Sequence, residues 1–561
     1  MNINKTLCST AILLSVIACT HTTVQHDQSA SESVSGSSEE RRIAYEQRKK
    51  ASSNLKLKSQ RSEQLAKRSA PTAASFKFYD ILPSSADQRD LEQTNTYRDE
   101  REGAIKLTRV SPLSTFSVDV DTASYIRAKS YIDRGLLPPE SSIRSEEFIN
   151  ALNYGYEQPA NTDDPISIMT QIGPTPWNQE TSLLQIGLNA HELNMEDRPP
   201  ANLVLLIDVS GSMSSAQKLP LLKRALNSTL TLLDERDTIS VVTYSGNNEI
   251  LVEGVKGDDD KRILNAIEKL EAKGSTNMGD GMSQAYKLAH QYATKDSNNR
   301  ILMFTDGDLN VGMEEDELVS FAKKQKALNI DLTILGMGNY GYHDAALENL
   351  SNEADGQYHF IGNYHNALKT LNSSFLGSIY NVAEDVKIQV EFNPDHIAEY
   401  RLIGYENRSL TSAEFNNDTK DSGDMGSGQS VTALYEIVWS DSKFRFIDSL
   451  KYGEKSDNNQ DAKIAEIATI KLRYKQPGDT QSHLKTIVIS NDKQRDPSEQ
   501  FYQAVSAASL AQLMGSSQHI GDFSSSDLMS WIEKHKTELP HGFMEMLSAY
   551  SSLSSYVQPR G

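Results

Sequence analysis

Cysteine is scarce in this chain of 561 residues, where the only two are Cys8 and Cys19. Basic residues are also in deficit, with 56 Lys and Arg against 76 Asp and Glu, so the formal net charge is −20. Proteins that bind nucleic-acid phosphates need a basic face to displace counterions, and this composition argues against that class. Hydrophobic residues make up only 38% of the chain, which argues against a polytopic membrane protein.

The N-terminus has the pattern of an export signal. Lys5 precedes a mostly apolar stretch at 7–18, which is the length of a signal-peptide core and too short to span a bilayer. The stretch leads into Val-Ile-Ala-Cys19, which resembles a bacterial lipobox. This resemblance implies that 1–18 is a lipoprotein signal peptide and that Cys19 is the lipidated first residue, which leaves no intramolecular disulfide. An ordinary secretory signal with a chance cysteine is the alternative.

Thr20 follows the cysteine, and a residue other than Asp at this position implies sorting to the outer membrane in Gram-negative bacteria. We therefore expect a lipid-anchored protein of the bacterial cell envelope that faces the periplasm. Residues 19–75 are rich in Ser, Gln and charge and have few aromatic residues, so they cannot bury enough apolar surface to fold alone. This segment is predicted to be a disordered or part-helical tether.

The motif around which the chain is organised lies at 202–213. Five consecutive apolar residues, 203–207, predict a strand buried on both faces of a parallel sheet. At its carboxyl end Asp208, Ser210 and Ser212 alternate across a turn, so one carboxylate and two hydroxyls point at a common centre. Hard oxygen donors of this kind suit Mg2+ or Mn2+.

These residues resemble the metal-ion-dependent adhesion site (MIDAS) of von Willebrand factor type A (VWA) domains. The resemblance implies a Thr from a second loop and an Asp from a third, which match Thr276 in Lys-Gly-Ser-Thr-Asn and Asp306 in Phe-Thr-Asp-Gly-Asp. It implies one Mg2+ (or Mn2+) ion held by Asp208, Ser210, Ser212, Thr276 and Asp306. A VWA domain that keeps its fold but has lost its metal is the alternative.

Strands and helices alternate around this motif. Apolar runs begin at 203, 239, 301 and 330, and helical patterns occur at 217–233, 258–271, 279–292 and 314–328. The alternation predicts an α/β domain at 199–372 with a doubly wound, mostly parallel sheet. The resemblance implies that this sheet is of the VWA (Rossmann-like) type. Such sheets bind ligands outside the carboxyl ends of their strands, which is where the metal loops lie.

β-rich segments precede and follow this domain, at 76–198 and 373–495. The stretches 112–125 and 400–408 resemble the regions that flank the VWA domain in bacterial proteins of the YfbK type. Because neither flanking segment has enough strands to close a core, we expect 76–198 and 380–490 to pack together as one sandwich-like domain. The VWA domain is then either inserted in this sandwich or flanked by it. Residues 496–561 are predicted to form a C-terminal helical region.

Acidic residues outside the metal motif have structural interpretations. Asp119 and Asp121 are predicted to cap the helix that follows them. The loop 416–424 offers three carboxylates, from Asp418, Asp421 and Asp424. Such a set suits Ca2+, but an acidic, solvated hairpin loop is the favoured interpretation.

No enzymatic motif accompanies the metal site. The chain has no Gly-x-Ser-x-Gly elbow, no Gly-x-x-x-x-Gly-Lys phosphate loop and no His-Glu-x-x-His pair. We therefore predict a non-enzymatic protein that binds a protein ligand through a carboxylate on the metal, beside an apolar rim of Met213, Met278 and Tyr340. The alternative for each of these three residues is that it fills the core of the domain. An accessory subunit of an envelope ATPase or transport machine, for example one associated with a MoxR-type ATPase, is the alternative.

Replacing Cys19 by Ala tests the lipid anchor. The tether has no other stretch apolar enough to hold the mature protein on a membrane, so Cys19→Ala should move it from the membrane fraction into the soluble envelope fraction. Detergent-free fractionation measures this change against the unaltered chain. Unchanged recovery of the variant with the membranes would count against the anchor.

Overall fold

The computed structural model describes residues 102–557, apart from 160–162, 247, 308–314, 327–328, 339–343, 353, 355, 364–366, 368–370, 372–376, 378, 421, 449–465 and 491–495. The predicted signal peptide, Cys19 and the tether lie outside the described residues.

The middle of the chain forms a sheet whose described strands run in the order β10-β9-β8-β5-β6-β7. The strands are β5 (Ala201–Asp208), β6 (Thr238–Tyr244), β7 (Glu249–Lys256), β8 (Asn298–Thr305), β9 (Asp331–Met337) and β10 (Tyr358–Ile361). Neighbours pair in parallel except the edge strand β7, which is antiparallel to β6. β5 is buried along its whole length, as expected of a strand that is covered on both faces.

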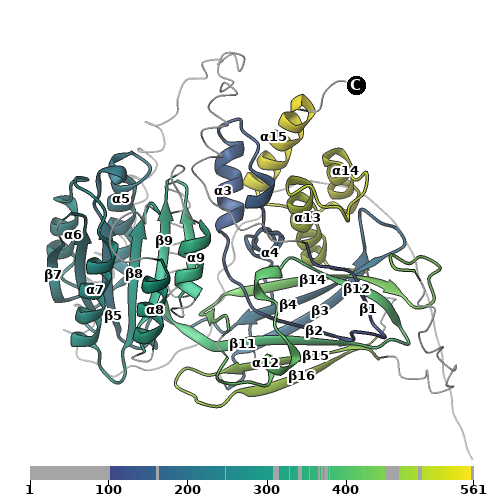
Figure 1. The fold of residues 1–561 in the computed structure, drawn as a ribbon, viewed down its shortest axis with the longest axis horizontal. Coiled ribbons are helices and arrows are strands. Elements are labelled where there is room, and N and C mark those ends of the chain that lie inside the picture. The colour runs from purple at the N-terminus through teal and green to yellow at the C-terminus, as the bar shows by residue number, and fades with distance from the viewer. Residues whose placement is uncertain are drawn as a thin grey trace, which may run out of the picture. The chain divides into compact units, whose positions relative to one another are not determined.

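Helices cover both faces of this sheet (Figure 1). They are α5 (Leu219–Thr229), α6 (Asp260–Glu268), α7 (Met278–Tyr292), α8 (Glu315–Lys326) and α9 (Asp344–Asn352). Successive side chains of β5 point to opposite faces, so Leu205 joins a core with α5 and α6, whereas Leu206 joins a second core with α7, α8 and α9. The predicted doubly wound α/β sheet is confirmed, and β7 and β10 are strands that the prediction missed.

Two further sheets are built jointly from the segments before and after this domain. Their described strands run in the orders β1-β12-β14-β4-β3 and β13-β11-β15-β16, and β2 pairs with β11. The strands are β1 (Lys106–Leu107), β2 (Leu113–Ser117), β3 (Ile166–Pro174), β4 (Ser182–Ala190), β11 (Asn381–Phe392), β12 (Ile397–Ile403), β13 (Met425–Gly426), β14 (Ser430–Trp439), β15 (Glu466–Lys475) and β16 (His483–Ser490).

Strand pairing crosses the insertion. β2 is antiparallel to β11, with Phe116 opposite Ile388, and β4 is antiparallel to β14, with Ile186 opposite Ala433. In Figure 1 these blue and green strands lie side by side. The four side chains share one buried core, so each segment closes its core only with the other. The predicted sandwich with an inserted α/β domain is confirmed.

A helical layer packs on one sheet of the sandwich. It comprises α3 (Ala123–Ile132), α4 (Ser145–Asn150), α13 (Glu499–Met514), α14 (Ser525–His535) and α15 (His541–Val557). Phe148 of α4, Phe501 of α13 and Leu547 of α15 share a buried cluster with Leu434 of β14. The predicted C-terminal helices are therefore present, and α15 is an additional one.

The predicted caps at Asp119 and Asp121 are wrong. Thr122 is the N-cap of α3 and its side chain makes no capping hydrogen bond, whereas the backbone N–H of Ser124 in the first turn donates to the carboxylate of Glu147. Instead, the guanidinium of Arg408 lies 2.9 Å from Asp119 Oδ2 and 3.5 Å from Asp121 Oδ2, and Asp121 Oδ1 accepts a hydrogen bond from the backbone N–H of Tyr358. The free-energy cost of two buried carboxylates without a nearby cation is larger than the cost of a helix end without a cap.

The chain enters and leaves the inserted domain at one place, where the side chain of Arg198 is completely buried. Its guanidinium donates to both carboxylate oxygens of Asp237, at 2.7 and 2.6 Å, and to the hydroxyl of Tyr380 at 2.8 Å. Arg198 precedes β5 and Tyr380 precedes β11, so one side chain ties the two crossings together. Asp237 also accepts a hydrogen bond from the backbone N–H of Ala201.

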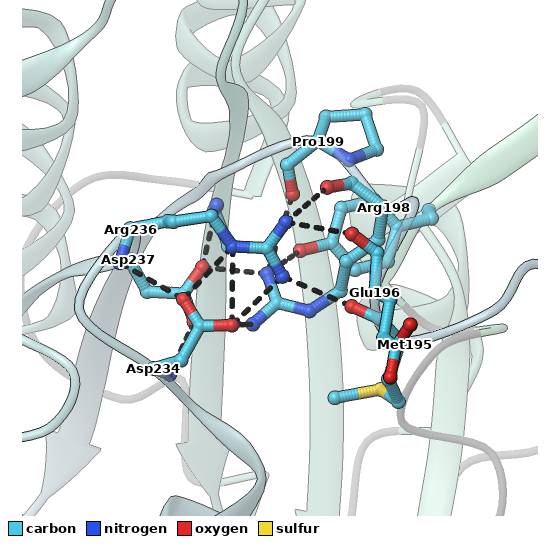
Figure 2. A network of polar contacts seen from close by, with 9 residues as sticks. Met195, Glu196, Arg198, Pro199, Asp234, Arg236 and Asp237 are labelled. Atoms are coloured by element: carbon cyan, nitrogen blue, oxygen red, sulfur yellow. Dashed lines mark hydrogen bonds and ion pairs between the residues drawn. The ribbon is translucent and has the colours of Figure 1, made fainter. Parts of the chain in front are cut away.

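A second arginine completes this junction (Figure 2). Arg236 donates to Asp234 and to the carbonyl oxygens of Met195, Glu196 and Arg198, so it fixes the loop that leads into β5. The hydrogen bonds from Arg236 lower the pKa of Asp234 to about 2. Asp234 also accepts from Arg198 at 3.0 Å, and it therefore joins the two arginines as a charged acceptor.

Replacing Arg198 by Met should destabilise the protein by about 3–5 kcal/mol, because it leaves the Asp237 carboxylate buried without its cation. Urea unfolding followed by circular dichroism measures the change. Arg262→Met is the matched control: Arg262 is exposed on α6, and its loss should change the free energy of unfolding by less than about 0.5 kcal/mol. A loss below about 1 kcal/mol in Arg198→Met would show that the junction does not depend on this pair.

Candidate metal centre

The first loop of the centre leaves β5 at Asp208, which is fully buried. Asp208 Oδ1 accepts a hydrogen bond from the backbone N–H of Ser210 at 2.8 Å. The hydroxyl oxygens of Ser210 and Ser212 lie 2.9 Å apart. A short 3-10 turn, Gly211–Ser214, therefore gathers one carboxylate and two hydroxyls at the end of the strand.

The second loop is attached to the first by backbone hydrogen bonds. The N–H of Gly211 donates to the carbonyl oxygen of Gly274 at 3.0 Å, and the N–H of Lys273 donates to that of Val209 at 2.7 Å. Gly274 has a φ of +88°, in the left-handed region that favours glycine. Thr276 follows and is 4% exposed, so this loop brings a buried hydroxyl to the same edge of the sheet.

The third loop follows β8, the neighbour of β5 in the sheet. Parallel neighbours end at the same edge, so Asp306 emerges beside Asp208. Asp306 is 2% exposed, and its Oδ2 lies 2.8 Å from the ammonium nitrogen of Lys218. The same ammonium donates to the carbonyl oxygen of Ser212 at 3.1 Å. Lys218 therefore links the first and third loops.

Lys218 is not among the residues predicted from the sequence. It is the N-cap of α5, and a lysine at the start of a helix usually extends into solvent. Gly338, which follows β9 with a φ of +96°, leaves the space that the Lys218 side chain occupies, because a Cβ at this position would lie 2.3 Å from Cε of Lys218. Only the folded chain brings this glycine next to the lysine, so the sequence alone does not connect the two.

Tyr244, the last residue of β6, is fully buried near the carboxylates. Burial and then the charge of Asp208 raise the pKa of Tyr244 well above its ordinary value, and the charge of Asp306 acts in the same direction. The phenol therefore stays protonated at neutral pH. Tyr244 lies opposite Asp208 in the β5–β6 pair, and Asp306 follows β8, the other neighbour of β5, so these three residues belong to one polar centre.

The chemistry of this centre fits a hard divalent ion. It offers two carboxylates and three hydroxyls, and among the described residues no group of three or more His, Cys, Asp or Glu offers an alternative set. The Lys218 ammonium shows that a positive charge is accommodated against Asp306. The residues that would hold the ion are Asp208, Ser210, Ser212, Thr276 and Asp306. A bound ion would act there as a Lewis acid toward a ligand oxygen.

Comparison with known proteins places this geometry in a family. Three family models match the chain, one described as von Willebrand factor at 91–185, one as von Willebrand factor type A domain at 203–308, and one as the C-terminal region of the uncharacterized protein YfbK at 377–553. The chain is 35% identical to the uncharacterized protein YfbK of Escherichia coli (strain K12) over 457 residues, which is 80% of this chain and 79% of that protein. The chain belongs to the YfbK family.

Other known proteins align with a smaller part of the chain or have a lower sequence identity to it. The inter-alpha-trypsin inhibitor heavy chain H3 of Homo sapiens is 29% identical over 217 residues, which is 37% of this chain and 22% of that protein. A solved structure, the von Willebrand factor type A protein from Catenulispora acidiphila, aligns with 68% of this chain and 96% of its own at 14% identity and a TM-score of 0.38.

The apolar rim predicted around the centre is wrong for this YfbK-family protein at two of its three residues. Met213 is fully buried in the core on one face of the VWA sheet, and Met278, which is 1% exposed, lies in the core on the other face. Both thioethers fill the helix–sheet interfaces because apolar burial there outweighs exposure on a loop. Tyr340 lies outside the described residues.

The acidic loop before β13 uses its described carboxylates within the protein. Asp418 accepts hydrogen bonds from Ser482 and Arg473, and the bond from Ser482 is the main cause of its lowered pKa. Asp424 accepts hydrogen bonds from two groups of β11. Asp421 lies outside the described residues. The two described carboxylates therefore serve as structural acceptors in the sandwich.

Binding of Mg2+ or Mn2+ should depend on both carboxylates of the centre. Protein lacking residues 1–75 should bind one ion, and Asp208→Ala or Asp306→Ala should abolish binding, because each removes one of the two charged ligands. Isothermal titration calorimetry measures the affinity. Asp418→Ala is the control, since it removes a carboxylate from the sandwich and should leave the affinity unchanged. Equal affinities in all three variants would refute the assignment.

Proposed function

We propose that this protein binds a protein partner through a divalent ion held by its VWA domain. The proposal is supported by two buried carboxylates, Asp208 and Asp306, which follow neighbouring strands at the carboxyl edge of the inserted sheet. Loops at that edge also carry the hydroxyls of Ser210, Ser212 and Thr276. Ser212 is exposed whereas Ser210 is buried, so the centre opens toward solvent at one side. Loops at this edge of an α/β sheet are where ligands bind.

The charge of the centre indicates the chemistry of the partner. Five oxygen ligands leave one position of an octahedral ion for an external oxygen. The protein ligands contribute two negative charges, from Asp208 and Asp306, so a divalent ion retains enough electrophilicity to accept a further carboxylate. A partner that presents an exposed Asp or Glu therefore suits the sixth position.

The N-terminal sequence supports a location for this function. The lipobox-like segment that ends at Cys19 supports a lipid anchor in the bacterial envelope, on the outer membrane and facing the periplasm. None of the described helices is both long and apolar enough to cross a bilayer. A non-enzymatic role in holding a partner near the membrane follows from a metal centre with a free ligand position and from the lack of catalytic motifs in the sequence.

A pull-down from envelope extract tests the function. Protein starting at residue 76 should capture its partner in Mg2+, release it in EDTA and recapture it in Mn2+, because the ion bridges the two proteins. Changing the contact Asp or Glu of the captured partner to its amide should remove binding, measured by surface plasmon resonance.

Two variants make this test specific. Ser212→Ala removes the exposed hydroxyl of the centre and should weaken capture, whereas Ser442→Ala alters a serine of the sandwich and should not. A partner whose affinity is the same after chelation and in Ser212→Ala would show that the protein works through another surface.

A further inference from the structure

A lysine occupies the metal centre of the VWA domain. The Lys218 ammonium lies 2.8 Å from Asp306 Oδ2 and 3.1 Å from the carbonyl oxygen of Ser212. The side chain of Lys218 is 11% exposed and that of Asp306 is 2% exposed, so the pair is largely shielded from water. Charges interact more strongly at such a site than on an open surface.

Backbone hydrogen bonds and packing against a glycine fix the position of Lys218. Its backbone is held at the start of α5, where its N–H donates to the carbonyl oxygen of Ser215 and its own carbonyl oxygen accepts from the N–H of Leu222. Its methylene stem lies against Gly338, where a Cβ would approach Cε to 2.3 Å. The backbone is therefore fixed, and the ammonium reaches Asp306 across the end of β9.

The lysine changes the charge balance of the centre. With Asp208 and Asp306 alone, a divalent ion would bring the centre to zero net charge, and a partner carboxylate would then make it negative. With Lys218 included, the same ion leaves one positive charge, and a partner carboxylate brings the centre to zero. A divalent ion held by Asp306 would also be repelled by the ammonium of Lys218, since like charges in a shielded site interact strongly.

We propose that Lys218 is a resident counter-ion that weakens the binding of the divalent ion alone and couples it to the binding of a carboxylate ligand. The proposal rests on the metal-dependent function proposed above and adds how metal binding is regulated. The centre holds its ion tightly only together with an anionic partner. Lys218 acts on the ion through Asp306 and through its charge, so it is a positioning residue and not a ligand.

Neutral variants of Lys218 test this role. Lys218→Met keeps most of the stem without the charge, and Lys218→Gln keeps a hydrogen-bond donor for Asp306 should the first variant fold poorly. The full chain from Cys19 onward, purified in detergent, is titrated with Mn2+ by calorimetry. Both variants should bind Mn2+ at least about tenfold more tightly than the parent chain, a change of about 1.4 kcal/mol.

Acetate serves as the carboxylate probe. It should raise the Mn2+ affinity of the parent chain relative to chloride at equal ionic strength, and it should raise that of the Lys218 variants less, because their loaded centre is already neutral. Thermal unfolding gives an independent reading. Without metal the variants should melt at a lower temperature than the parent, since Asp306 has lost a buried partner, and Mn2+ should raise their melting temperature by a larger increment.

Lys223→Met is the matched control, because Lys223 is a lysine of the same helix whose ammonium makes an exposed contact with the carbonyl oxygen of Glu268. It should leave both Mn2+ affinity and acetate coupling unchanged. Mn2+ binding that is equal or weaker in the Lys218 variants than in the parent would overturn the counter-ion role alone. Absence of Mn2+ binding in every chain would overturn the proposed function, and this inference with it.

Discussion

The architecture of this protein depends on one buried contact, in which Arg198 holds Asp237 and Tyr380. A sandwich made from two chain segments closes only if the inserted domain returns the chain to the place where it left. The guanidinium is planar and permanently charged, so it fixes a carboxylate and a hydroxyl in one arrangement. With the crossings side by side, β2 reaches β11 and β4 reaches β14 in the observed registers.

The position of this junction also determines where the inserted domain can act. Arg198 precedes β5 and Asp237 precedes β6, so the junction lies at the amino ends of these parallel strands. The loops that carry Asp208 and Asp306 leave from the opposite, carboxyl ends. The doubly wound sheet separates the junction, where the domain is attached, from the polar centre. The residues of the centre lie on loops, and the buried strands of the sheet hold these loops in place.

The loss of hydration offsets most of the attraction within a buried ion pair, so the presence of such a pair is weak evidence for stability. The pairs Arg198–Asp237 and Arg401–Glu436 are enclosed by protein, with side chains at most 4% exposed. The pair Lys218–Asp306 differs because it lies among the loops of the candidate metal centre. If the centre holds a divalent ion as proposed, the Asp306 carboxylate would pair with that ion as well as with the internal cation Lys218.

The sequence by itself determined what depends on neighbours along the chain: the apolar run of β5, the alternation of strands and helices, and the oxygen residues after β5 and β8. Tertiary structure decided the rest. The guanidinium of Arg408 pairs with the carboxylates of Asp119 and Asp121. Met213 and Met278 are buried in the two cores of the VWA domain. The ammonium of Lys218 lies beside Asp306, and its methylene stem packs against Gly338. Periodicity and turn chemistry are local and can be read in order. The partner of a buried charge is set by which distant segments share an interior, because a charge removed from water must find its counter-ion wherever the fold supplies one.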